Sequence, residues 1–127
     1  MPHLSSKKVR KDIFLRMNER FINSVARIKN SQESKRFLNE ILTPSEKIML
    51  SKRLALLFML ESGYSFTAIR KNLKLSQSTI VRFWKMFKRD RFPFIKFRVQ
   101  EEKKRKEFWG KFERIVNAGL PPRGRGR

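Results

Sequence analysis

The sequence contains no cysteine and a single histidine, His3. Without cysteine the chain can form neither a disulfide nor a thiolate zinc site, and it has no cysteine nucleophile. A Ser-His-Asp arrangement or a histidine-based metal site would depend on His3, at a terminus that we expect to be mobile. The composition therefore argues against an enzyme, and we expect no metal and no cofactor.

Acidic residues are also scarce. The 11 Asp and Glu face 32 Lys and Arg, which gives a formal net charge of +21. A chain with this charge repels itself when compact, and binding to a polyanion, most commonly nucleic acid, relieves the repulsion. The one close acidic pair on a predicted helix face, Glu101 and Glu102, is flanked by Lys and Arg, whereas a metal-dependent nuclease needs converging carboxylates. The charge balance predicts a nucleic-acid-binding protein.

No apolar run is long enough to span a membrane. The longest, Leu54–Leu60, has seven residues, against the roughly 20 that a spanning helix needs. Residues 1–8 lack the apolar stretch of a secretory signal. We therefore expect a cytoplasmic, nucleoid-associated protein with no membrane partner. An apolar fraction of 39% with 12 phenylalanines still provides a core, so the chain is not disordered throughout.

Glycine and proline, five of each, divide the chain into helical stretches with no sustained β-type alternation. We predict one all-α domain over residues 1–117 with about six helices, followed by a disordered Gly/Arg tail over 118–127. The arginines of that tail (Arg123, Arg125, Arg127) could follow a nucleic-acid backbone. The expected helices cover approximately 6–29, 32–41, 44–62, 65–73, 76–88 and 93–117.

Thr43-Pro-Ser-Glu46 is the clearest helix start. It combines an N-cap threonine, a proline at the first helical position and a glutamate that can reach back to the Thr43 amide. Gly63 is a natural residue to follow the end of this helix. Its second half, Leu54–Leu60, is apolar on every face, which is typical of a helix surrounded by protein. We expect it to lie at the centre of the fold.

Two short helices with a tight turn between them predict a helix-turn-helix at about 65–88. On the second helix, Ile80, Phe83, Trp84 and Phe87 share one face, and the opposite face is cationic with small polar residues near its start. Such a helix suits the DNA major groove. Residues 65–89 include seven basic side chains and no acidic one, which favours nucleic-acid contact over a plain solvated surface. Packing explains Trp84 and Trp109 better than base stacking does.

The order and spacing of several short motifs resemble those of a known family. The motifs are Leu42-Thr-Pro-Ser-Glu46, Leu50-Ser-Lys-Arg53, Gly63-Tyr-Ser65, Ile69-Arg-Lys-Asn-Leu73 and Ser78-Thr-Ile-Val-Arg82, followed by Lys88. With them the chain resembles the Trp repressor family over roughly residues 21–88. The resemblance implies an all-helical, intertwined homodimer that regulates transcription by binding double-stranded operator DNA. It also implies that Arg70 contacts the DNA backbone and that Gln77, Ser78, Thr79 and Val81 face the groove.

The predicted DNA-binding residues combine these positions with the basic residues around them. They are Arg70, Lys71, Lys74, Gln77, Ser78, Thr79, Val81, Arg82, Lys85 and Arg89. We expect Arg70 to contribute about equally to the binding affinity for all DNA sequences. We expect Gln77 to pair bidentately with adenine. The aromatic segment 92–97 is expected to be a dimer contact, because a small monomer could hardly cover it.

The resemblance also implies the position of an effector pocket. Two replacements in this sequence imply that the pocket no longer has room for a ligand. Arg53 and Arg82 match the two arginines that sandwich the indole of bound L-tryptophan in the family. Phe83 replaces a small glycine of the tryptophan-binding members, and Met86 replaces the serine that would hold the ligand's amino group. The pocket is thus expected to be filled by Phe83, which predicts a member without a small-molecule effector.

Two other functions remain open from the residues. One is a transposase-derived helix-turn-helix module that targets a separate, acid-rich catalytic domain to DNA. The other is a ribosome-associated or architectural nucleic-acid-binding protein, which the high charge and the Gly/Arg tail favour and the capped helix-turn-helix disfavours.

Overall fold

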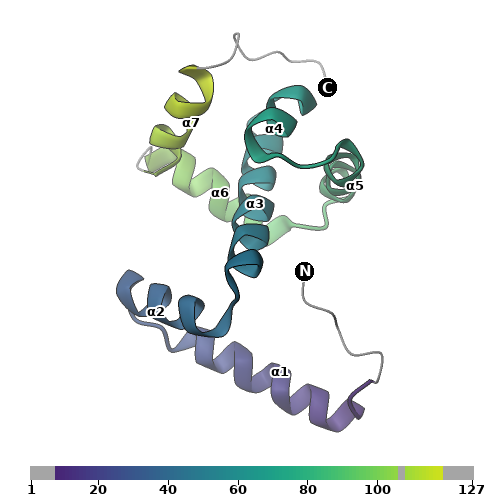
Figure 1. Cartoon of the computed structure of the whole chain (residues 1–127), viewed down its shortest axis with the longest axis vertical. Coiled ribbons are helices and arrows are strands. Elements are labelled where there is room, and N and C mark those ends of the chain that lie inside the picture. Colours follow the sequence, from purple (N-terminus) through teal and green to yellow (C-terminus); the bar gives the residue numbers. More distant parts are fainter. Residues whose placement is uncertain (1–7, 106–107, 119–127) are drawn as a thin grey trace. The chain divides into compact units, whose positions relative to one another are not determined.

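The computed structural model describes residues 8–105 and 108–118. They form seven helices and no strand, which confirms the all-α class (Figure 1). The helices are α1 (Lys11–Ala26), α2 (Ser31–Ile41), α3 (Pro44–Glu61), α4 (Phe66–Leu73), α5 (Gln77–Lys88), α6 (Pro93–Arg105) and α7 (Phe108–Ala118). The chain divides into two compact units between Met49 and Leu50, within α3. None of the described helices has the length and apolar character needed to cross a membrane.

The first helix is shorter than the sequence suggested. α1 begins at Lys11 and ends at Ala26, instead of extending over 6–29. Asp12 lies in its first turn, where its carboxylate interacts favourably with the positive end of the helix dipole. The Arg10 guanidinium lies 2.8 Å from this carboxylate and holds the pKa of Asp12 below its ordinary value, while the pKa of Arg10 is raised.

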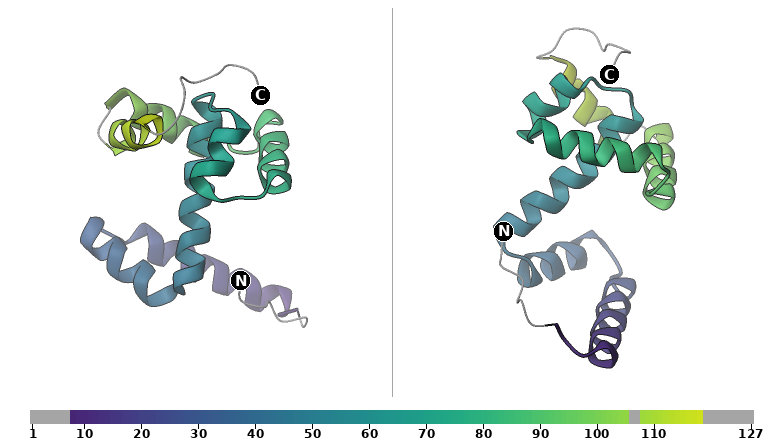
Figure 2. Two further views of the ribbon diagram at one scale, coloured as in Figure 1. Left: turned by 45° about the horizontal axis from the view of Figure 1, so that its top comes forward. Right: turned by 90° about the vertical axis from the view of Figure 1, so that its right-hand side faces the viewer.

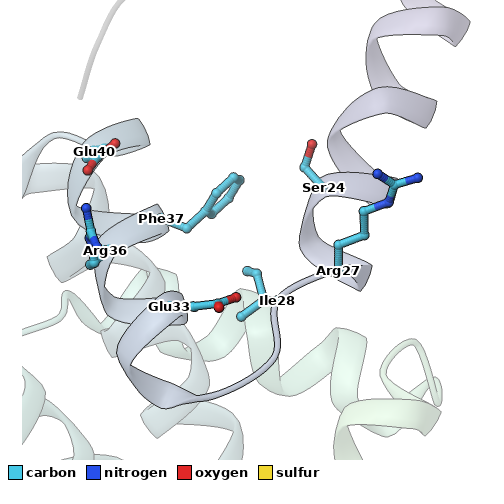
Figure 3. Close-up of a pocket in the computed structure, with 7 residues that line it drawn as sticks. All are labelled: Ser24, Arg27, Ile28, Glu33, Arg36, Phe37 and Glu40. Atoms are coloured by element: carbon cyan, nitrogen blue, oxygen red, sulfur yellow. The ribbon is translucent and has the colours of Figure 1, made fainter.

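The first unit has almost no core of its own. Neither α1 nor α2 contains a buried residue. The Phe21 and Phe37 rings approach to 6.3 Å between their centroids, and Phe37 projects from α2 toward α1 (Figure 3). An open hollow of about 540 Å³ remains there, lined by Ser24, Arg27, Ile28, Glu33, Arg36, Phe37 and Glu40. This unit therefore leaves much of its apolar surface uncovered.

The ends of α3 follow the local signals in the sequence. Glu46 N donates to Thr43 Oγ1 at 3.1 Å, and Thr43 N donates to Glu46 Oε1 at 2.8 Å, which is the expected capping box. At the other end Gly63 adopts φ 83°. Its N–H donates to the Leu60 carbonyl and the Tyr64 N–H donates to the Met59 carbonyl, which is the glycine-terminated ending that the sequence predicted.

The core of the second unit is built around the second half of α3. Leu56, Leu57, Phe58, Met59 and Leu60 are all buried, as expected for a helix that is apolar on every face. They belong to one cluster with apolar residues of the other helices: Ile69 and Leu73 of α4, Ile80 and Phe83 of α5, Val99 of α6, and Trp109 and Val116 of α7. Burial begins at Leu56, two residues after the start of the apolar run, and Leu54 is 45% exposed.

The single last helix expected over 93–117 is instead divided in two, so the described residues form seven helices where about six were expected. α6 and α7 are two helices that pack against each other (Figure 2). The Trp109 ring stacks on Phe58 of α3 with centroids 4.0 Å apart and planes at 9°, and Trp109 Nε1 donates to Glu102 Oε2 of α6 at 3.0 Å. One straight helix would carry Trp109 away from α3, so burying this ring favours two helices over one.

The C-terminal tail was expected to start at residue 118. Ala118 is instead the last residue of α7. Residues 119–127, with the three arginines of the expected tail, lie outside the described residues, as does His3.

Candidate nucleic-acid interface

The helix-turn-helix forms where the sequence placed it. α4 and α5 lie against each other and are joined by the short segment 74–76 (Figure 1). Each begins with a serine cap: Ser65 Oγ accepts from Ala68 N at 3.1 Å, and Ser76 Oγ accepts from Thr79 N at 3.2 Å. Ile69 and Leu73 of α4 are buried, as are Ile80 and Phe83 of α5. This shared core holds α5 in a fixed position on α4.

Lys74, in the turn, has left-handed backbone angles of φ 54° and ψ 45°. Its N–H donates to the Arg70 carbonyl at 2.9 Å and so closes the end of α4. A residue other than glycine in this conformation costs about 1–2 kcal/mol. Lys74 therefore carries local backbone strain, and its exposed side chain lies in the turn between α4 and α5.

The exposed side of α5 and of the end of α4 carries most of the predicted DNA-binding residues. The exposed ones are Arg70, Lys71, Lys74, Gln77, Ser78, Arg82, Lys85 and Arg89, while Thr79 and Val81 are half-buried. On the opposite side Trp84 packs edge-on against Phe66 at 5.5 Å, so Trp84 is a packing residue. The structure therefore leaves most of these cations and small polar residues exposed, while Ile80 and Phe83 of α5 are buried in the core.

The start of α5 carries a network of hydroxyl groups. Ser76 Oγ donates to Thr79 Oγ1 at 2.9 Å and lies 3.2 Å from Ser78 Oγ. Beside it, Arg70 Nη1 donates to Gln77 Oε1 at 3.3 Å. No pattern in the sequence predicts this contact between the two helices, because it depends on how α4 and α5 pack.

Positive charge on this surface is not neutralised by the protein. No residue of 65–89 takes part in an ion pair within the part of the chain that the structure describes. Uncompensated cations on an exposed helix surface attract phosphate groups and release their counterions on binding. Over the same described part, no group of three His, Asp or Glu side chains could hold a metal ion.

Phe83 is the side chain that most alters the effector pocket suggested by the sequence. Its ring is buried, at 8% exposure, and stacks on Phe92 at 6.1 Å. The Arg53 Cζ of α3 lies 5.7 Å from the ring centroid and the Arg82 Cζ of α5 lies 5.3 Å from it. Both distances are within the cation–π range of about 6 Å. The ring thus contacts both arginines, and Met86 is half-buried nearby on α5.

Two further cations lie over aromatic rings of α5. Lys88 Nζ is 4.4 Å from the Trp84 ring, and Lys96 Nζ of α6 is 5.0 Å from the Phe87 ring. The four-residue spacing of Trp84 and Lys88 could have indicated the first contact. The second depends on the position of α6, which the sequence does not specify. Of the two, the contact of Lys96 with Phe87 links the end of α5 to α6.

Comparison with known proteins decides the family. A family model described as Trp repressor protein matches residues 17–94, more than half of the chain. The chain belongs to the Trp repressor family. The family is one of helix-turn-helix DNA-binding regulators and not of enzymes, and α4 and α5 form the helix-turn-helix of this chain. No curated protein and no solved structure matches the chain.

The Trp repressor match covers some of the helices and not others. It begins within α1 and ends at Phe94, the second residue of α6. The matched part therefore contains the whole of α2, α3, α4 and α5. α7, which contributes Trp109 and Val116 to the core, lies outside it.

Proposed function

We propose that this protein is a sequence-specific transcriptional regulator that binds double-stranded DNA without tryptophan as co-repressor. The observation that carries the proposal is the buried Phe83 ring beneath Arg53 and Arg82, in a helix-turn-helix whose exposed surface is cationic. Acting on chromosomal DNA, it would be a nucleoid-associated protein of the cytoplasm.

DNA would be read by α5. A major groove about 12 Å wide admits one helix, and the start of α5 carries only small or uncharged side chains, Gln77, Ser78 and Thr79. Arg82, Lys85 and the turn residue Lys74 would reach the flanking phosphates, because long cationic side chains can contact the backbone on either side of the groove. The buried face of α5 holds this helix rigid, which favours base reading over loose electrostatic association.

Phe83 would take the place that an indole occupies in tryptophan-sensing members. Its ring already contacts the two arginines that match the indole-binding pair. Inserting a second ring would overpack a close-packed site, at a cost of about 1–3 kcal/mol or more. The ligand's ammonium group would also face Met86, whose thioether is only a weak acceptor. DNA binding would then be constitutive and set by protein concentration.

Selection from a random duplex library tests the proposed function. The protein should enrich one sequence with two half-sites about one helical turn apart. A transposase-derived targeting module would also enrich a sequence, but would require a catalytic partner domain for its activity. A ribosome-associated or architectural protein would bind RNA at least as tightly as DNA at matched salt. Equal binding of all duplexes, or preference for RNA, would contradict the proposal.

A homodimer is the second part of the proposal. The first unit leaves large apolar side chains exposed on α1 and α2, and exposed apolar surface of this extent usually marks an interface. These side chains are Ile13, Phe14, Leu15, Met17, Phe21, Ile22, Val25, Leu38 and Ile41. A second copy that covered them and the hollow beside Phe37 would provide the core that this unit lacks.

Light scattering of the full chain tests the dimer. We expect a mass of twice 15.3 kDa at micromolar concentration. Phe21→Asp should shift the population toward monomer, because the carboxylate would be buried in the interface. Lys35→Asp, on the exposed surface of α2, is the matched control and should leave the dimer intact. A monomeric wild-type protein would contradict this part of the proposal.

A further inference from the structure

Arg70 extends from α4 to the first residue of α5. Its Nη1 donates to the Gln77 side-chain oxygen at 3.3 Å, and both side chains are exposed. A phosphate-contacting side chain on the first helix would be expected to point along the DNA backbone. Here the guanidinium lies instead at the start of the helix that enters the groove.

The hydrogen bond changes what Gln77 offers to a base. An amide oxygen has two lone pairs, and Arg70 occupies one of them. The amide nitrogen keeps both of its N–H donors, and the guanidinium keeps the donors that Gln77 does not use. Lys74 adds an exposed ammonium group, which can donate hydrogen bonds but cannot accept them. The surface at the start of α5 is therefore rich in donors and poor in acceptors.

A donor-rich surface fits one base edge best. In the major groove guanine presents two acceptors, N7 and O6, whereas adenine presents an acceptor and a donor, and cytosine presents a donor. We infer that Arg70 and Gln77 act as one unit that reads a guanine, in place of a backbone contact and a separate adenine contact. This inference rests on the proposed DNA-binding function and makes Arg70 a specificity-determining residue.

The test uses the duplex selected by the wild-type protein and its single-base-pair variants. Arg70→Ala and Gln77→Ala should each lose about tenfold or more of the discrimination at the same G·C pair, and the double variant should lose little more than either single one. Arg70→Lys keeps the charge but not the fork of donors. It should retain most of the overall affinity and lose the guanine preference. Lys71→Ala, the neighbouring exposed cation, should weaken all duplexes equally.

Each opposite result overturns the inference. A uniform loss with Arg70→Ala and retained preference with Arg70→Lys would make Arg70 a phosphate contact. If the wild-type protein selects adenine at the base pair where Gln77→Ala loses discrimination, the free lone pair of the Gln77 oxygen would be accepting from the base, which contradicts the reading of guanine. Additive losses at two different base pairs would show that the two residues act separately. Failure of the wild-type protein to enrich any duplex would instead reject the proposed function itself.

Discussion

Phe83→Ala should lose most of its DNA affinity and recover it when indole is added. Removing a buried phenylalanine ring costs about 3–5 kcal/mol when the site cannot collapse. Here the ring packs against Phe92 and lies beneath Arg53 of α3 and Arg82 of α5, so its loss would remove the packing of α5 against Phe92 and Arg53. An apolar cavity of this kind binds small aromatic molecules. Indole should therefore restore the contacts and the position of α5.

Fluorescence anisotropy with a labelled duplex measures this effect, and thermal unfolding separates binding from folding. Phe58→Ala is the matched control, because Phe58 is equally a core phenylalanine but stacks on Trp109 of α7 and not beneath the two arginines. It should be destabilised by a similar amount without any rescue of DNA affinity by indole. If Phe83→Ala bound DNA like the wild-type protein, Phe83 would not support the reading position of α5.

The second large effect concerns salt. Raising the salt concentration from about 50 to 200 mM should weaken binding by about 10³-fold or more, because a dimer with several phosphate contacts per subunit releases the matching counterions. The cations of residues 65–89 have no acidic partner in the described protein, so we expect DNA phosphates to serve as their counterions.

Variants assign the salt effect to individual residues. Lys85→Gln, on the exposed side of α5, should lower the slope of log affinity against log salt by about 1 for each subunit. Lys35→Gln, equally exposed on α2, should leave the slope unchanged. A slope near zero for the wild-type protein would mean that the positive surface does not contact phosphates. An equal change for both variants would show that the phosphate contacts are not confined to the helix-turn-helix.

Features set by neighbouring residues could be predicted from the sequence. The capping box at Thr43 and the serine caps at Ser65 and Ser76 depend on side chains three residues from their partners, so sequence spacing specifies them. The burial of Leu56–Leu60 follows from a helix without a polar face. These local signals were sufficient to place the helix-turn-helix.

Features set by tertiary packing could not be predicted. The division between α6 and α7 depends on the packing of Trp109 against the Phe58 ring, which is distant in the sequence. The hydrogen bond between Arg70 and Gln77 likewise needs the angle between α4 and α5. The sequence showed that Phe83 replaces a glycine, but the distances of Arg53 and Arg82 from its ring required the structure.

Titration of the selected duplex with and without L-tryptophan tests whether Phe83 closes the effector pocket. With Phe83 in contact with both arginines, millimolar L-tryptophan should leave the affinity for DNA unchanged. Calorimetry with the protein alone should show no binding of the amino acid. A rise in DNA affinity of about tenfold or more, equivalent to about 1.4 kcal/mol, would contradict the account. Arg53 and Arg82 would then be ligand-binding residues, and Phe83 would have to move aside for the indole.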